Sequence, residues 1–278
     1  MSRRYEERFK QLGKLGKKAF IPFTLLGWPN REESLKMIKE MIECEASALE
    51  LGIAFSDPVA DGPVIQKAAY ETIASGFSVH DAFELITEVR KLDGSIPIGI
   101  LVYFNTVLAK GIGSFFSLAK ESGVDGILIA DLPAENAQEV LPAAETNGID
   151  LIFLVSPVTT PNRLDIILSR ASGFLYLVSR LGVTGTMERS TAKDLELRAL
   201  VDKIRKRSRV PVCAGFGISS QADAERMFEI GVDGVITGSR VIQLAQSSSS
   251  CSSGVLKQYF KEMVGASARS NRYEHCDS

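Results

Sequence analysis

Eight short runs of uninterrupted apolar residues, separated by longer amphipathic segments, constrain the fold of this chain more than any other feature. A strand with one face in water alternates apolar and polar residues, whereas an unbroken apolar run indicates a strand covered on both faces, as in a parallel sheet. The sequence therefore predicts a parallel sheet with helices packed outside it. The runs span residues 19–27, 48–53, 96–103, 126–130, 150–155, 173–178, 210–216 and 234–238.

The segments between the runs have helical periodicity. Segment 32–43 places Leu35, Ile38 and Met41 along one stripe, and segment 79–92 repeats the pattern. Eight strand–helix rounds are typical of a closed barrel or a doubly wound sheet, and 278 residues suit a single (β/α)8 barrel. We therefore predict an α/β protein with a TIM barrel.

Additions to the eight rounds are also predicted. Segment 4–15 reads as an extra helix before the first strand, in a position to close the bottom of the barrel, and further helices are expected near strands 2 and 8. We expect one domain over residues 1–266, followed by a polar, disordered tail at 267–278.

Composition excludes several classes of function. Hydrophobic content of 45%, charged content of 24% and a net charge of −2 fit a globular protein without nucleic-acid or membrane partners. No apolar run reaches the length of a membrane span. Four cysteines without CxxC spacing predict a cytoplasmic location. Two histidines leave little material for a histidine-based metal site, so no metal is expected.

Glycine-containing loops follow the last strands. Gly215 and Gly217 follow strand 7, and Gly238 and Ser239 follow strand 8. Loops at these positions of such barrels bind phosphate through amides at helix N-termini. Each Gly-Ser pair alone could be ordinary helix capping, but the two loops together favour a phosphate site.

Glu50 interrupts an apolar run, between Leu49 and Leu51. A charged residue there is tolerated only when it is paired or functional. It is either a structural acid bonded to a neighbour or a side chain that enters the mouth of the barrel. Burial at the mouth would raise its pKa toward neutrality and suit it to transferring protons in both directions.

Asp57 and Asp61 lie in the loop that follows Glu50, and each precedes a proline. Both could be helix caps, so the residues alone do not rank them. An acid–base pair beside a phosphate site suits proton transfer or carbon–carbon chemistry on a phosphorylated substrate. Four residues near strand ends could line an apolar slot or simply pack the barrel: Phe23, Leu101, Tyr103 and Leu154.

Six motifs of the sequence are specific enough to compare with known families. The longest and most specific is ALELGIAFSDPVADGPVIQ (48–66); the shorter ones are PFTLLGWP (22–29), ILIADLP (127–133), YLVSRLGVTG (176–185), GFGIS (215–219) and TGSRV (237–241). With these motifs the chain resembles the tryptophan synthase α subunit family, from about residue 5 to residue 265.

The resemblance implies a lyase of tryptophan biosynthesis that cleaves indole-3-glycerol phosphate to indole and glyceraldehyde 3-phosphate by a reverse aldol reaction, without a cofactor in this chain. Glu50 and Asp61 align with the two catalytic acids. The indole pocket would comprise Phe23, Leu101, Tyr103, Leu154 and Thr184, and the phosphate site Gly185, Gly217, Gly238 and Ser239.

The resemblance further implies a partner. A pyridoxal-phosphate-dependent β subunit would receive the indole in an α2β2 heterotetramer, with Asp57, Pro58, Asp131 and Pro133 at the interface. Segment 179–190 would be a lid over the substrate.

Two other functions remain as alternatives. The first is a different phosphate-binding TIM-barrel enzyme, an isomerase or epimerase, which would lack the FSDPVADGP loop. The second is a non-catalytic regulatory barrel subunit, which loss of either acid would have favoured.

Overall fold

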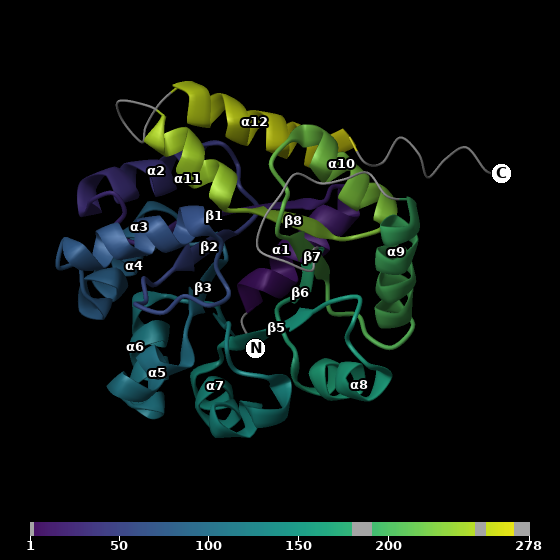
Figure 1. Ribbon diagram of the computed structural model, residues 1–278, viewed down its shortest axis with the longest axis horizontal. Coiled ribbons are helices and arrows are strands. Elements are labelled where there is room, and N and C mark those ends of the chain that lie inside the picture. Colours follow the sequence, from purple (N-terminus) through teal and green to yellow (C-terminus); the bar gives the residue numbers. More distant parts are fainter. Residues whose placement is uncertain (1–2, 180–190, 248–253, 270–278) are drawn as a thin grey trace.

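A closed barrel of eight parallel strands forms the centre of the molecule, as predicted (Figure 1). The structure is a computed structural model that describes residues 3–179, 191–247 and 254–269. Each strand pairs in parallel with the next, and β1 closes the ring against β8. The strands are β1 (Ala19–Leu25), β2 (Leu49–Gly52), β3 (Ile98–Val102), β4 (Gly126–Ile129), β5 (Asp150–Val155), β6 (Leu175–Val178), β7 (Val212–Gly215) and β8 (Gly234–Thr237).

Helices surround the ring and cover its outer face (Figure 1). Two helices follow β2 and two follow β8, which confirms the predicted additions, and β3 and β4 are also each followed by two helical segments. The helices are α1 (Arg3–Lys14), α2 (Arg31–Glu43), α3 (Pro63–Ala74), α4 (Val79–Leu92), α5 (Phe104–Lys110), α6 (Ile112–Ser122), the 3-10 helix η1 (Ala134–Glu139), α7 (Leu141–Asn147), α8 (Pro161–Arg170), α9 (Thr191–Arg205), α10 (Gln221–Ile230), α11 (Ser239–Gln246) and α12 (Gly254–Arg269).

The continuous apolar runs are explained by burial on both faces of the strands. All seven residues of β1 are buried, with alternate side chains directed into the barrel and toward the helices. Strand register decides which residues share the inner face. Phe23 of β1 pairs with Glu50 of β2, and Glu50 pairs with Gly99 of β3, so these three positions lie on the same face.

Helix α1 closes the N-terminal end of the barrel through Tyr5, which is 1% exposed. A Cβ atom on Gly99 would lie 2.6 Å from the Tyr5 hydroxyl, and one on Gly126 would lie 3.0 Å from its ring. Glycine at these positions therefore makes room for the tyrosine inside the ring. The ring of Tyr5 also packs edge-on against Phe174, with 5.5 Å between centroids.

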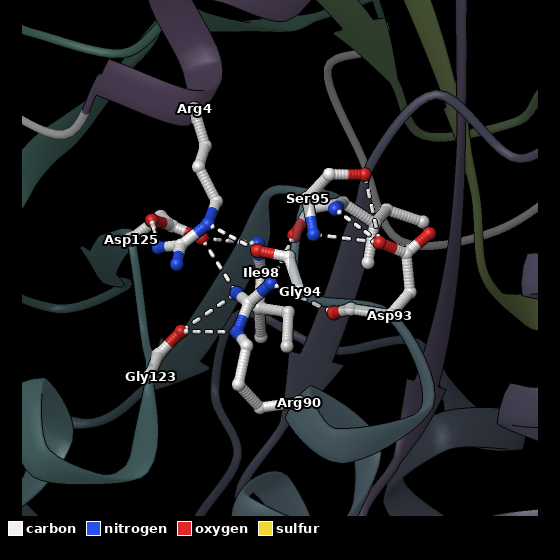
Figure 2. Close-up of polar contacts among 9 residues, drawn as sticks. Arg4, Arg90, Asp93, Gly94, Ser95, Ile98, Gly123 and Asp125 are labelled. Carbon is white, nitrogen blue, oxygen red and sulfur yellow. Dashed lines mark hydrogen bonds and ion pairs between the residues drawn. The ribbon is translucent and has the colours of Figure 1, made fainter.

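A buried carboxylate attaches α1 to the barrel (Figure 2). Asp125, which precedes β4, accepts hydrogen bonds from Arg4 Nη1 at 2.9 Å, from Arg90 Nη2 at 2.8 Å and from the Ile98 amide at 2.9 Å. One acid thus joins α1, α4 and β3. Arg90 also donates two hydrogen bonds to the Gly123 carbonyl, from Nε at 3.2 Å and from Nη2 at 2.7 Å.

The C-terminal helix packs close to the start of β1. Helix α12 continues to Arg269, beyond the boundary at residue 266 that the sequence suggested, and Ser267 is buried. The Ser267 carbonyl accepts a hydrogen bond from the Lys18 amide at 3.0 Å. Residues 270–278, most of the predicted tail, lie outside the described residues. In the described part of the chain, no helix has the length and apolar character needed to cross a membrane.

Candidate active site

Glu50 lies on the inner face of β2 and is 3% exposed. Its pairing with Phe23 and Gly99 shows that it is directed into the barrel, not toward the outer helices. The Glu50 carboxyl forms no hydrogen bond with any residue that the structure describes. The interpretation of Glu50 as a structurally bonded acid therefore has no partner to support it.

Burial, and to a smaller extent the nearby negative charge of Asp61, together raise the pKa of Glu50 to about 8. Both effects disfavour the carboxylate, because it has lost its water and faces a second negative group. Glu50 is therefore protonated at neutral pH in the free protein, and it can give up a proton and take one back.

Asp61 comes from the loop between β2 and α3 and is 8% exposed. Its Oδ2 accepts a hydrogen bond from the Tyr103 hydroxyl at 2.8 Å. The alternative of a helix cap is excluded, because Gly62 is the N-cap residue of α3 and no side chain caps that helix. Burial raises the pKa of Asp61 to about 6, and the hydrogen bond from Tyr103 opposes this rise.

Tyr103 fixes the loop as well as the acid. Its hydroxyl oxygen accepts a hydrogen bond from the Ala60 amide at 3.0 Å, and its ring stacks on Phe55 with 5.0 Å between centroids. Two residues of the β2–α3 loop, Phe55 and Ala60, are thereby held against the end of β3. Tyr103 therefore positions the carboxylate in addition to lining the site.

Three of the residues predicted for the apolar slot lie on one face of the barrel. Strand register places Phe23, Leu101 and Leu154 on the inner face, the face that carries Glu50. Leu101 and Leu154 are only half-buried, which leaves apolar surface for a ligand. Thr184, the last residue predicted for the slot, lies outside the described residues, as does most of the predicted lid.

Tyr176 is a site residue that the sequence analysis missed. It lies on the inner face of β6 and is 6% exposed. Burial raises its pKa most, and the charges of nearby Glu50 and Asp61 raise it further. A Cβ atom on Gly215 would collide with its hydroxyl. The available signal was a polar hydroxyl within an apolar run, the same kind of signal that identified Glu50.

The two loops predicted to bind phosphate follow the neighbouring strands β7 and β8. Helix α10 is capped by Ser220 and by Asp223, whose carboxylate accepts hydrogen bonds from the amides of Ser219 and Ser220. Helix α11 begins with Gly238 as N-cap and has no side-chain cap. Its first amides are therefore the ones available to an anion.

Gly217 and Gly185 are the other two residues predicted to bind phosphate. Gly217 has a φ of +80°, a conformation that glycine adopts without strain. The preceding Phe216 is also left-handed, at +66°, and its carbonyl accepts a hydrogen bond from Ser179 Oγ at 2.6 Å. This turn directs the backbone of the loop after β7. Gly185 lies outside the described residues.

The residues predicted for a partner interface lie on loops at the same end of the barrel. Asp57 and Asp131 are exposed, as is Pro133, and Pro58 is half-buried. Asp131 Oδ1 accepts a hydrogen bond from the Phe104 amide at 2.7 Å, which ties its loop to α5. Val59, which follows Pro58 in the same loop, is 77% exposed and is an apolar residue available to a partner.

Comparison with known proteins bears directly on this site. The model of the family described as tryptophan synthase alpha chain matches residues 9–268. The chain belongs to this family. The match covers β1 to α12, so it includes every strand of the barrel and both buried acids, and the resemblance seen in the sequence motifs is confirmed.

Individual members of the family align along almost their whole length. A tryptophan synthase alpha chain from Photobacterium profundum is 39% identical over 95% of this chain and 98% of its own. The crystal structure of tryptophan synthase subunit alpha from Legionella pneumophila has a TM-score of 0.85 at 29% identity, covering 96% and 98% of the two chains. A chain of the tryptophan synthase complex from Pyrococcus furiosus has a TM-score of 0.80 at 33% identity, covering 90% and 99%.

Proposed function

We propose that this chain is the α subunit of a tryptophan synthase and cleaves indole-3-glycerol phosphate to indole and glyceraldehyde 3-phosphate. Family membership gives the reaction class. The observation that supports the chemistry is Glu50, a buried carboxyl whose pKa is raised to about 8 beside a second carboxyl of pKa about 6. Two acids with separated pKa values can hold opposite protonation states at neutral pH.

In the first proposed step, protonated Glu50 delivers its proton to C3 of the indole ring. The ring then carries positive charge, shared with its N–H group. Asp61, ionised at neutral pH, accepts a hydrogen bond from that N–H and stabilises the charge. Tyr103 holds the Asp61 carboxylate in place for this contact.

In the second step, the Glu50 carboxylate removes the proton from the hydroxyl on the side-chain carbon bonded to C3. The oxygen electrons form the aldehyde C=O bond, the bond between that carbon and C3 breaks, and its electron pair returns to the ring. Indole leaves with the proton that Glu50 first gave, and Glu50 ends protonated again. Atoms and electrons balance over the two steps without an oxidant or a reductant.

The rest of the substrate is held by two parts of the site. Phe23, Leu101 and Leu154 would enclose the indole ring, and the uncapped start of α11 at Gly238 and Ser239 would bind the phosphate. The chain needs no cofactor of its own for these steps, and pyridoxal phosphate would belong to the partner. A cytoplasmic location stays a prediction from composition.

A β subunit is the proposed partner, in an α2β2 complex. The exposed loops that carry Asp57 and Asp131 lie at the end of the barrel from which indole would leave. We expect a purified β subunit to bind this chain and to raise its rate of indole formation. An unchanged rate and no complex in sedimentation would contradict the partner assignment without affecting the proposed chemistry.

Indole formation from indole-3-glycerol phosphate tests the chemistry directly. We expect Glu50→Gln to lower kcat by at least about 10³-fold with KM nearly unchanged, because the amide cannot carry the proton. Asp61→Asn should lower kcat by about 10²-fold, as expected for loss of one electrostatic contact in the transition state.

Matched variants separate these roles from general effects of removing a charge. Asp57→Asn changes an exposed acid in the same loop, and Glu145→Gln changes an exposed glutamate on α7. Both should keep the rate of the unmodified chain. Normal turnover by Glu50→Gln, or equal losses in Asp57→Asn and Asp61→Asn, would contradict the assignment.

A further inference from the structure

A cavity of about 540 Å³ lies at the N-terminal end of the barrel, opposite the end that carries the catalytic acids. Its lining comes from α1, from the segment that joins α1 to β1, from the first residue of β5, and from the segments that enter β6, β7 and β8. None of the residues assigned to catalysis, substrate or partner that the structure describes contributes to it. The volume is within the range of small-molecule sites.

Four cations and three acids are among the described residues of the lining. Lys10, Lys17, Lys18 and Arg209 line the cavity, and none of the four forms an ion pair with a residue that the structure describes. An unpaired cluster of cations around a concave surface attracts anions.

The acids of the lining offset this charge only in part. The Asp233 carboxylate is already paired, since it accepts hydrogen bonds from Arg205 at 3.0 Å and from the Val212 amide at 2.9 Å. Asp150 is buried and also has an interaction partner. Glu6 is exposed on α1 and is the only other acid among the described residues of the lining. The cations therefore keep an excess of charge for a ligand.

Apolar side chains make up the rest of the wall. Phe9, Leu12, Val210 and Pro211 line the cavity and are all half-buried. Phe9 lies against Phe174, with 6.5 Å between ring centroids, so the apolar wall is backed by the barrel core. Half-buried apolar surface beside unpaired cations suits a ligand that has both an apolar body and a negative group.

We propose that this cavity is a second ligand site, for a small organic anion with a flat apolar body and a carboxylate, sulfonate or phosphate group. The apolar body lies against Phe9, Leu12 and Val210, and the anionic group lies among Lys10, Lys17 and Arg209. The site is separated from the catalytic acids by Tyr5, which closes the ring between them.

A fluorescence titration with 8-anilinonaphthalene-1-sulfonate tests the site, because this probe joins an aromatic body to a sulfonate. We expect saturable binding to one site, weakened by added salt. Lys17→Glu and Arg209→Glu should each weaken it roughly fivefold to tenfold, since each replaces an attraction by a repulsion. Lys14→Glu is the matched control, because Lys14 lies on α1 outside the lining.

Gly13 allows a test that leaves the charge unchanged. It lines the cavity on α1, and a Cβ atom there would meet no atom within 4 Å. Gly13→Phe should occupy part of the cavity and weaken probe binding by about tenfold or more, and Gly13→Ala should retain it. Thermal unfolding of each variant verifies that the fold is kept.

Saturating indole-3-glycerol phosphate should leave the bound probe in place, because the two sites are at opposite ends of the barrel. Displacement by that substrate would place the probe in the active site and overturn the proposal. Binding without saturation, or equal affinity in Gly13→Phe and the unmodified chain, would overturn it as well.

Discussion

At the scale of single residues, the two acids of the candidate active site, Glu50 and Asp61, differ in their hydrogen bonding. Asp61 accepts a hydrogen bond from Tyr103, whereas Glu50 has no partner among the described residues. Burial is the largest cause of both raised pKa values; the hydrogen bond from Tyr103 then limits the pKa of Asp61 to about 6, whereas the charge of Asp61 adds to the rise that brings the pKa of Glu50 to about 8. The proposed reaction needs this separation, because one acid must donate a proton while the other stays negative.

Removing the Tyr103 hydroxyl should reduce that separation. In Tyr103→Phe, the carboxylate of Asp61 loses its donor, so its pKa rises and the acid limb of the pH profile of kcat/KM shifts to higher pH. The Ala60 amide also loses its acceptor. We expect about a tenfold lower kcat/KM at neutral pH. Tyr70→Phe, at an exposed tyrosine on α3, should leave the profile unchanged; the same profile in both variants would contradict the role of Tyr103.

Glu50 should also lower the stability of the fold as pH rises. Its folded pKa of about 8 lies above its ordinary value of 4.5, so the folded chain retains a proton that the unfolded chain releases between these values. The free energy of unfolding then falls as pH increases through this window and levels off above it. Glu50→Gln does not titrate, so it should become more stable than the unmodified chain by roughly 2–4 kcal/mol at pH 9 and by little at pH 5.

Urea unfolding of both proteins at the two pH values measures this difference. Glu145→Gln, which removes an exposed glutamate, should show no such pH dependence. A stability difference between Glu50→Gln and the unmodified chain that is equal at pH 5 and pH 9 would mean that Glu50 does not retain its proton in the folded state.

At the scale of elements, helix α1 acts as a plug: it closes the N-terminal end of the barrel and is attached there by an ion pair. Tyr5 fills the ring above Gly99 and Gly126, and Asp125 binds Arg4 of the plug and Arg90 of α4 at once (Figure 2). Asp125 is 2% exposed, so removing its charge leaves two guanidinium groups without their shared acceptor.

Asp125→Asn should therefore lower the free energy of unfolding by about 3 kcal/mol. Asp165→Asn is the matched control, because Asp165 pairs with Arg207 at the surface and should contribute less than about 1 kcal/mol. Urea denaturation at neutral pH measures both. A loss in Asp125→Asn no larger than in the control would mean that the plug is held by Tyr5 and its apolar contacts alone.

At the scale of the whole molecule, the barrel could be predicted because local pattern and global topology agree. Eight doubly buried strands leave eight unbroken apolar runs. The runs extended past some strand ends, because apolar residues also occupy the entry to a strand: the run 210–216 contains β7 only from Val212 to Gly215. Glu50 could be singled out because a charged residue inside an apolar run is tolerated only when it is paired or functional.

Other parts of the site depend on contacts that the sequence does not display. Asp61 could not be ranked above Asp57 from local residues, because the distinction lies in Tyr103, 42 residues away. Tyr176 was missed because tyrosine is common in strands. The two glycine loops looked alike, and only the structure distinguishes the start of α10, occupied by Asp223, from the uncapped start of α11.

The protonation state of Glu50 at neutral pH is the point on which the proposed chemistry depends. Infrared difference spectroscopy, with Glu50→Gln as the reference, isolates the carboxyl signal of this residue as pH is varied. We predict a protonated Glu50 carboxyl at pH 7 that ionises near pH 8. A signal that is already ionised at pH 6 would leave the first step without its proton and contradict the account.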